Sequence, residues 1–171
     1  MRKNLIIAAI FTLLIIVSDT LVQNWTFESI TSAEGIAVTP FFNLVKVWNP
    51  GVSFGMLQTI PQGQWVLSGL ALVIVTVILY FLLKTTKRFE IYGYSLVIAG
   101  ALGNTLDRVR HGAVFDYLDF YAYGYHWPAF NITDMAIFIG VSLLIVGSFK
   151  HDKANNKDDM TTIKDDENTI K

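Results

Sequence analysis

The sequence predicts an all-α membrane protein with four transmembrane helices and a small β-containing extracytoplasmic platform. Of its 171 residues, 53% are hydrophobic and only 16% are charged, whereas a soluble domain is usually about 25% charged. The apolar residues gather in four stretches, and a membrane-spanning helix needs about 20 such residues. These stretches are approximately residues 4–22, 65–83, 91–106 and 131–149.

Three of the four stretches are long enough to span a membrane by themselves. The third, 91–106, is shorter and rich in glycine, so we expect its helix to continue into the polar residues that flank it. The first could instead be a secretory signal peptide, because Arg2 and Lys3 precede its apolar run. A signal peptide would be followed by an A-x-A cleavage site, and none follows here. We therefore favour a first transmembrane helix.

The positions of lysine and arginine predict the orientation, because cytoplasmic loops carry an excess of both. Basic residues precede the first stretch, lie between the second and third, and follow the fourth, whereas segment 23–64 contains only Lys46. Both termini are therefore expected in the cytoplasm, and segments 23–64 and 108–130 are expected outside.

We expect residues 1–150 to form a single membrane domain. Segment 23–64 is too long for a simple connector, and its run TPFFNLVKVWN alternates enough to predict one or two strands of an outer platform. The outer loop 108–130 is dense in Tyr, Phe and Trp, which favour the membrane–water boundary. Residues 151–171 carry charges of both signs with little to bury, and we predict a disordered cytoplasmic tail there.

Four polar side chains are predicted to lie at one depth in the membrane. At about 1.5 Å per residue, Asp19, Asn104, Asp107 and Asp134 each lie about 24–28 Å along their helix from the nearest cytoplasmic Lys or Arg. Ionisable groups inside a membrane are costly and are therefore functional candidates. Their common depth predicts a polar layer near the outer face of the membrane.

Local spacing refines this layer. Asn104, Asp107 and Arg108 stand at i, i+3 and i+4, so they share a helix face, and Asn131 stands three residues before Asp134. Simpler explanations stay open at this point. Asn131 and Asp134 could be a helix N-cap and its third-position acid, and Asp107 with Arg108 could form a structural ion pair.

Asp116, between apolar residues of the outer loop, is a further candidate. It and Asp119 could be ordinary loop charges, and Asp19 could be a polar group that packs helices together. Two aspartates held close together, however, cannot both ionise easily. The charged member can take a proton from water while the neutral member polarises a carbonyl. Such a pair would make an aspartic protease that needs no metal and no cofactor.

Other chemistries have weaker support in the sequence. Residues 51–55, GVSFG, match the G-x-S-x-G motif of serine hydrolases, with His111 or His126 as the possible base. The sequence has no H-E-x-x-H motif and no cysteine that could act as a thiolate nucleophile. Its net charge of −1 gives no sign of a nucleic-acid partner.

A non-enzymatic alternative is a small transporter or proton pathway that uses Asp19, Asp107 and Asp134 as a relay. These acids cluster near one face of the membrane instead of tracing a path across it, which favours the protease hypothesis.

The motifs and their order resemble those of the lipoprotein signal peptidase family, also called signal peptidase II, over about residues 15–149. The matching blocks are Asp19 and residues 49–54 (NPGVSF), 100–108 (GALGNTLDR), 114–117 (VFDY) and 127–134 (WPAFNITD). The sequence departs from the family at Gln23, where a Lys is common, and at Ala99, where a Gly is common. The charged tail is an addition.

The resemblance implies that Asp116 and Asp134 are the catalytic acids. It implies supporting or substrate-binding roles for Asp19, Asn49, Gly51, Asn104, Asp107, Arg108 and Asn131. The substrate would be a prolipoprotein with a diacylglyceryl group on its cysteine, cut just before that cysteine. The enzyme would lie in the lipid of the bacterial cell membrane, with its active site near the outer face.

Overall fold

The computed structural model describes residues 1–32, 35–51 and 62–149. Its helices are α1 (Arg2–Ser29), α2 (Gly63–Lys84), α3 (Arg88–His111) and a C-terminal helix (Ile132–Phe149). Its strands are β1 (Ile36–Thr39), β2 (Phe42–Asn49), β3 (Val114–Ala122) and β4 (Tyr125–His126). The predicted tail, residues 151–171, lies outside the described part of the chain.

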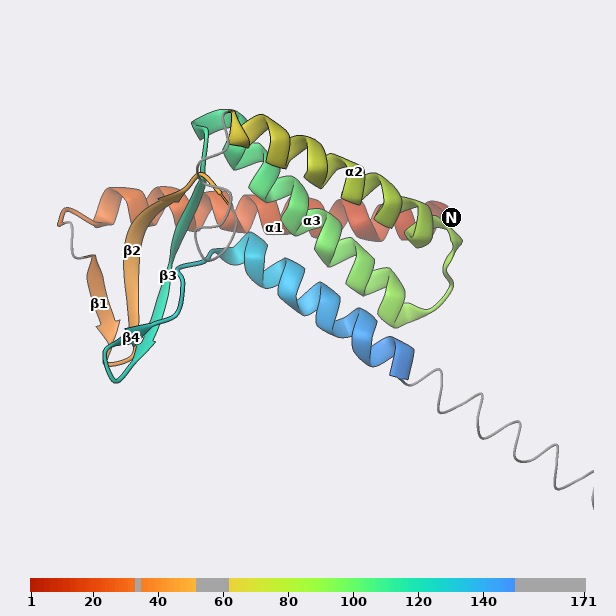
Figure 1. The fold of residues 1–171 in the computed structure, drawn as a ribbon. Helices are drawn as coiled ribbons and strands as arrows, with labels where there is room; N and C mark the ends of the chain where they lie inside the picture. Colours follow the sequence, from red (N-terminus) through yellow and green to blue (C-terminus); the bar gives the residue numbers. More distant parts are fainter. Residues whose placement is uncertain (33–34, 52–61, 150–171) are drawn as a thin grey trace, which may run out of the picture.

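The helices form an antiparallel bundle with the sheet at one end. α1 and α3 run towards the sheet, whereas α2 and the C-terminal helix start near it and run away, so the N-terminus lies at the opposite end (Figure 1). α3 packs against both α1 and α2, and its glycines approach the C-terminal helix closely. α3 is therefore the central helix of the bundle.

Apolar side chains cover the outside of the bundle. Within the described residues, three helices are long and apolar enough to cross a membrane, namely α1, α2 and the C-terminal helix. Only 11–17% of the residues in their most apolar windows are buried inside the protein, so most of these hydrophobic side chains face outward. Lipid accommodates such a surface and water does not. The structure thus confirms a helical membrane protein.

α3 is longer than its apolar stretch, as predicted, and ends at His111; the C-cap residue Gly112 has a φ of +80°, the left-handed conformation that commonly ends a helix. It is more polar than the other helices because its neighbours, rather than lipid, surround much of it. Its buried residues include Ser95, Asn104, Asp107 and Arg108. A fourth membrane span at α3 stays a prediction, which its length and central position favour.

The described strands form one antiparallel sheet in the order β1-β2-β3-β4. In the pairing of β2 with β3, Val47 lies opposite Asp116 and Asn49 lies opposite Val114. An apolar cluster fixes the sheet against the end of α1, and its buried members are Ile30, Leu44, Phe115 and Tyr117. This packing ties β3 to the helix bundle at the position of Asp116.

The sheet differs from the predicted platform in two respects. First, α1 continues to Ser29, because buried Gln23 and Thr26 extend the helix face that includes Asp19. Residues 23–29 are therefore helical. Second, β3 and β4 belong to segment 108–130, which we predicted to be a loop. The first four residues of β3 are all buried, so the alternation that identifies a half-buried strand is missing there.

The close approach of α3 to the C-terminal helix predicts the effect of a single methyl group. A Cβ at Gly100 would lie 2.3 Å from the carbonyl oxygen of Thr133, whereas a Cβ at Gly69 on α2 would meet nothing within 4 Å. Alanine otherwise stabilises a helix by about 1 kcal/mol relative to glycine. We expect Gly100→Ala to lower the free energy of unfolding by about 1–3 kcal/mol and the matched control Gly69→Ala not to lower it. Thermal unfolding in detergent measures both, and equal Tm values would contradict the close contact.

Candidate active site

Asp116 lies on β3, and its side chain is only 2% exposed. The sequence suggested an outer loop for this residue, but the structure places it within the sheet, opposite Val47. Its Oδ2 accepts a hydrogen bond from Asn49 Nδ2 at 3.0 Å, and its Oδ1 accepts one from Asn131 Nδ2 at 3.1 Å. Each oxygen of the carboxyl group is thus held by an asparagine from a different segment.

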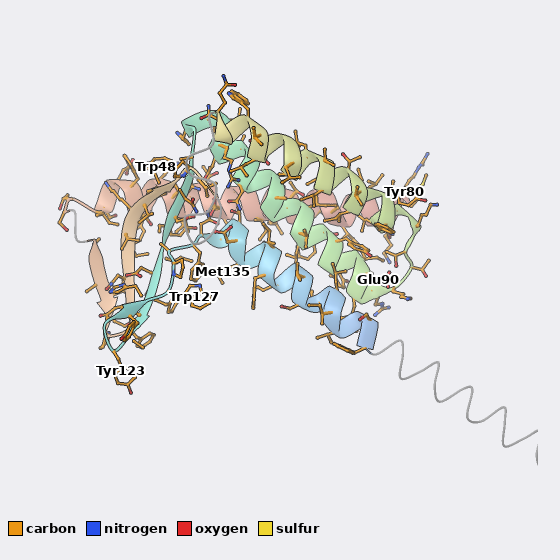
Figure 2. All side chains as sticks on the ribbon, in the orientation of Figure 1. Trp48, Tyr80, Glu90, Tyr123, Trp127 and Met135 are labelled. Atoms are coloured by element: carbon orange, nitrogen blue, oxygen red, sulfur yellow. The ribbon has the colours of Figure 1, made fainter. Side chains whose placement is uncertain are left out.

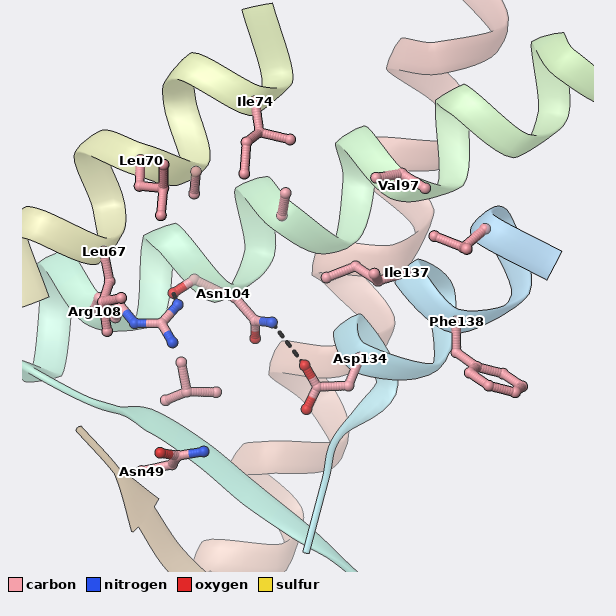
Figure 3. A pocket seen from close by; sticks show the side chains of 14 residues that line it. Asn49, Leu67, Leu70, Ile74, Val97, Asn104, Arg108, Asp134, Ile137 and Phe138 are labelled. Carbon is pink, nitrogen blue, oxygen red and sulfur yellow. Dashed lines mark hydrogen bonds between the residues drawn. The ribbon is translucent and has the colours of Figure 1, made fainter. Parts of the chain in front are cut away.

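Asp134 lies in the first turn of the C-terminal helix. Its backbone N–H donates to Asn131 Oδ1 at 2.9 Å, which is an N-cap contact. Its own Oδ1 accepts a hydrogen bond from Asn104 Nδ2 of α3 at 2.8 Å (Figure 3). The helix-cap explanation is therefore correct for Asn131 but incomplete, because the same side chain also holds Asp116.

The two asparagines connect the two acids. Asn131 Nδ2 lies 3.4 Å from Asn104 Oδ1, while Asn131 also contacts Asp116 and Asn104 also contacts Asp134. The hydroxyl of Thr133 lies 2.6 Å from the side-chain oxygen of each asparagine. A continuous chain of polar contacts thus joins β3, the C-terminal helix and α3.

Arg108 holds the turn that follows β2. Its Nη2 donates to the carbonyl oxygen of Gly51 at 2.7 Å, and the Gly51 N–H donates to Asn49 Oδ1 at 3.1 Å. This turn orients Asn49 towards Asp116. The described contacts do not support a structural ion pair between Asp107 and Arg108, whose side chains bind different partners.

A cavity of about 530 Å³ lies beside Asp134, between α2, α3 and the C-terminal helix (Figure 3). Its polar lining consists of Asn49, Asn104, Arg108 and Asp134, and the remaining lining residues are apolar. The apolar residues include Leu67, Leu70, Ile74, Val97, Ile137 and Phe138. An apolar group bound in this cavity would therefore lie next to the carboxyl group of Asp134.

A second cavity, of about 490 Å³, shares Asp134 and Phe138 with the first. Trp127, Phe130, Met135 and Ile139 are among its other lining residues. Figure 2 shows Trp127 and Met135 together on the side where the sheet meets the C-terminal helix. Asp134 therefore lies at the boundary between two largely apolar cavities.

Burial and a neighbouring acid change the titration of Asp116. Loss of solvent and, to a smaller extent, the charge of Asp134 raise its pKa from 3.8 to about 7, against the opposing effects of the hydrogen bond from Asn49 and the charge of Arg108. An aspartate with this pKa holds a proton part of the time at neutral pH.

Asp19 and Asp107 form a second polar cluster behind the first. Asp19 accepts a hydrogen bond from the Tyr117 hydroxyl at 2.9 Å, and Asp107 accepts one from the Phe115 N–H at 3.3 Å. Gln23 donates to both acids at 2.7 Å. The predicted polar layer therefore exists as two adjoining clusters, of which the first holds Asp116 and the second holds its neighbours on β3, Phe115 and Tyr117.

The structure supports the serine-hydrolase, metal-dependent and acid-pair hypotheses to different degrees. Ser53 of the GVSFG motif lies outside the described residues. His126 is bound to Asp119 at 2.9 Å, and the His111 ring contacts Trp48. In the part of the chain that the structure covers, no group of three His, Asp or Glu side chains could hold a metal ion. The acid pair is the arrangement that can perform hydrolysis by proton transfer alone.

Comparison with known proteins agrees with the motifs. A family described as signal peptidase (SPase) II matches residues 11–150. The chain belongs to the signal peptidase II family. It is 42% identical over 142 residues to a lipoprotein signal peptidase from Cupriavidus necator, covering 82% of this chain and 81% of that protein. The corresponding protein from Vibrio cholerae is 39% identical over 153 residues, covering 88% and 85%.

Two solved structures, both described as bacterial membrane enzymes determined by the in meso method, have the same fold. One has a TM-score of 0.76 and 29% identity over 86% of this chain and 90% of its own. The other has a TM-score of 0.73 and 28% identity over 84% and 92%. Membership of the signal peptidase II family makes this chain a peptidase.

Every candidate residue of the signal peptidase II motifs lies in one of the two clusters. Sequence reasoning did not identify Tyr117 or Thr133, and it treated Gln23 only as a departure from the family. Thr133 lies within the 127–134 motif and Tyr117 directly follows Asp116, which was the available signal. Their contacts depend on distant residues, with Tyr117 and Asp19 separated by most of the chain.

The raised pKa of Asp116 predicts how stability depends on pH. The folded state binds more protons than the unfolded state between the ordinary pKa of 3.8 and the folded value of about 7, so this group favours folding most below that range and loses its contribution as pH rises through it. We expect a lower Tm at about pH 8 than at about pH 5, and a smaller difference in Asp116→Asn. Thermal unfolding in detergent measures both. An unchanged difference in the variant would assign the effect to other groups.

Proposed function

We propose that the chain is an aspartic signal peptidase that removes signal peptides from diacylglyceryl-modified prolipoproteins. It would cut just before the lipidated cysteine, with Asp116 and Asp134 as the catalytic pair. The observation that carries the proposal is the linkage of these acids through Asn131 and Asn104 beside an apolar cavity. The relatives named lipoprotein signal peptidases support the same reaction.

The two acids would share one proton. The ionised carboxylate takes a proton from water, whose oxygen attacks the scissile carbonyl carbon, while the protonated carboxyl group donates to the carbonyl oxygen. The C–N bond of the tetrahedral intermediate then breaks: one hydroxyl group returns its proton to the second acid, and the departing amine of the lipidated cysteine takes a proton from the first acid, so the shared proton of the pair is restored. The raised pKa of Asp116 suits a carboxyl group that must hold a proton near neutral pH.

The supporting residues would keep this pair in place. Asn49 and Asn131 hold Asp116, and Asn104 holds Asp134. Arg108 holds Gly51, and with it the turn that carries Asn49. The three asparagines are neutral and Arg108 binds a backbone carbonyl. These residues would therefore position the two acids and take no part in proton transfer.

The two cavities suit a substrate with an apolar signal helix and acyl chains. Both are mainly apolar, and both reach Asp134. A scissile bond at their boundary would meet the acids while the apolar parts of the substrate stayed out of water. Such anchoring would fix the depth of the scissile bond in the membrane and hold that bond beside the acids.

The proposed orientation places both termini in the cytoplasm and the sheet outside. The N-terminus and the sheet lie at opposite ends of the bundle (Figure 1), and the acids lie at the sheet end. Exposed Tyr123, Tyr125 and Trp127, which lie in or next to the hairpin of β3 and β4, suit the membrane–water boundary. The active site would then lie near the outer face of the bacterial cell membrane.

Replacement of either catalytic acid should stop cleavage. Asp116→Asn and Asp134→Asn keep the shape of the side chain but remove its titratable proton, so we expect turnover to fall by about a hundred-fold or more. Asp119→Asn is the matched control, because Asp119 lies on the same strand but binds His126 and Asn43 instead. Cleavage of a lipidated precursor peptide in detergent measures all three.

Near-wild-type turnover in either dyad variant would disprove the assignment. The serine-hydrolase hypothesis makes the opposite prediction, since Ser53→Ala would then abolish activity. We expect that variant to cleave nearly as well as the wild type.

The enzyme should also distinguish lipidated from unmodified precursors. Each buried CH₂ contributes about 0.8 kcal/mol, and two chains anchor far better than one, so the diacylglyceryl group should hold the substrate beside the cavities. We expect much faster cleavage of a precursor with lipidated cysteine than of the same precursor left unmodified, in the same detergent. Equal kcat/KM for the two would mean that the signal helix alone supplies recognition.

A further inference from the structure

Gln23 links two acids that the proposed reaction does not use. It lies on α1 with an exposed fraction of 9%, and its Nε2 donates at 2.7 Å to Asp19 Oδ2 and at 2.7 Å to Asp107 Oδ2. A side-chain amide has two N–H donors, so one group satisfies one carboxyl oxygen on each of two helices. α1 and α3 are thereby joined at this level by a single side chain.

Both acids hold residues that flank Asp116 directly. Asp107 accepts the backbone N–H of Phe115 at 3.3 Å, on the N-terminal side of Asp116. Asp19 accepts the hydroxyl of Tyr117 at 2.9 Å, on its C-terminal side. The strand is therefore fixed on both sides of the catalytic acid by carboxyl groups that share one amide.

The same cluster also reaches the second acid. The Tyr117 hydroxyl accepts the backbone N–H of Ile132 at 3.3 Å, and Ile132 begins the helix that carries Asp134. Tyr117 is fully buried, so it has no room to shift without moving its neighbours. Displacement of Gln23 would thus shift both Asp116 and Asp134.

We propose that Gln23 is a positioning residue that sets the relative placement of Asp116 and Asp134 through Asp19, Asp107 and Tyr117. The inference rests on the proposed function of the dyad. A misplacement of about 1 Å in an active site can lower the rate about a hundred-fold. A chain of hydrogen bonds that ends on both sides of Asp116 controls displacements of this size.

Gln23 also leaves the charge of the cluster unbalanced. It is neutral, whereas the titratable and charged groups around it include acids from α1, α3, β3 and the C-terminal helix. These surrounding groups are Asp19, Asp107, Arg108, Arg110, His111, Asp116, Tyr117 and Asp134. A cation placed at position 23 would favour the ionised form of the nearby carboxyl groups.

Two variants of Gln23 separate positioning from charge. Gln23→Leu fills similar space without donors, and Gln23→Lys keeps donors but adds a positive charge. Asn24→Leu is the matched control, since Asn24 is the next residue of α1 and its side chain is exposed. Each full-length protein is purified in detergent, and kcat, KM and the pH profile are measured with a lipidated precursor peptide.

We expect Gln23→Leu to lower kcat by about ten-fold to a hundred-fold with little change in KM, because the dyad, not the substrate cavity, is displaced. Gln23→Lys should keep most of kcat and move both limbs of the pH profile to lower pH, because the added cation lowers the pKa of each nearby acid. Asn24→Leu should match the wild type. A wild-type kcat and pH profile in both Gln23 variants would overturn the proposal.

Tyr117→Phe keeps the test decisive if Gln23→Leu does not fold. It removes one hydroxyl from the same chain of contacts, so it should also lower kcat, and combining it with Gln23→Lys should give a non-additive change. Unchanged kcat in Tyr117→Phe, or strict additivity, would overturn the positioning role. Asp116→Asn in the same assay tests the dyad separately, because its inactivity would hold even if every Gln23 variant behaved as the wild type.

Discussion

The close packing of α3 against the C-terminal helix is the constraint on which the candidate active site depends. Gly100 and Gly103 leave no room for a side chain beside Thr133, so the two helices approach closely just before Asn104. This approach brings Asn104 within hydrogen-bonding distance of Asp134 and brings Thr133 to both asparagines. A wider spacing would separate Asp134 from the amide that orients it.

Neutral hydrogen-bond donors surround the carboxyl groups of the site. Buried Asp19, Asp107 and Asp116 share the region with half-buried Asp134 and with Arg108, and charged carboxyl groups in a low-dielectric interior are costly. Asparagine and glutamine amides donate hydrogen bonds to the carboxyl oxygens of these aspartates. Because the amides are neutral, they add no positive charge that would hold the acids in the ionised form. This environment keeps the pKa of Asp116 near neutrality, where an acid pair can both donate and accept a proton.

Much of the molecule could be predicted from local pattern. The apolar stretches predicted the helices. The polar layer was predicted from the common depth of Asp19, Asn104, Asp107 and Asp134. Asp116 was identified by its motif but assigned to a loop, because burial on both faces of β3 removes the alternation of a strand. The extension of α1 past residue 22 was also missed, since Gln23 and Thr26 are polar and their burial depends on neighbouring elements.

The sequence by itself determined the helical membrane class and the family, because apolar length and motif spacing are local properties of the chain, and it predicted Asp116 and Asp134 as the catalytic acids. Tertiary structure alone decided which amide meets which carboxyl group. Asn131 serves Asp116 as well as capping its own helix, and Gln23 bridges α1 to α3. The contacts of Asn131 with Asp116 and of Gln23 with Asp107 join residues 15 and 84 positions apart, so they form only when β3 and the helices have packed against one another.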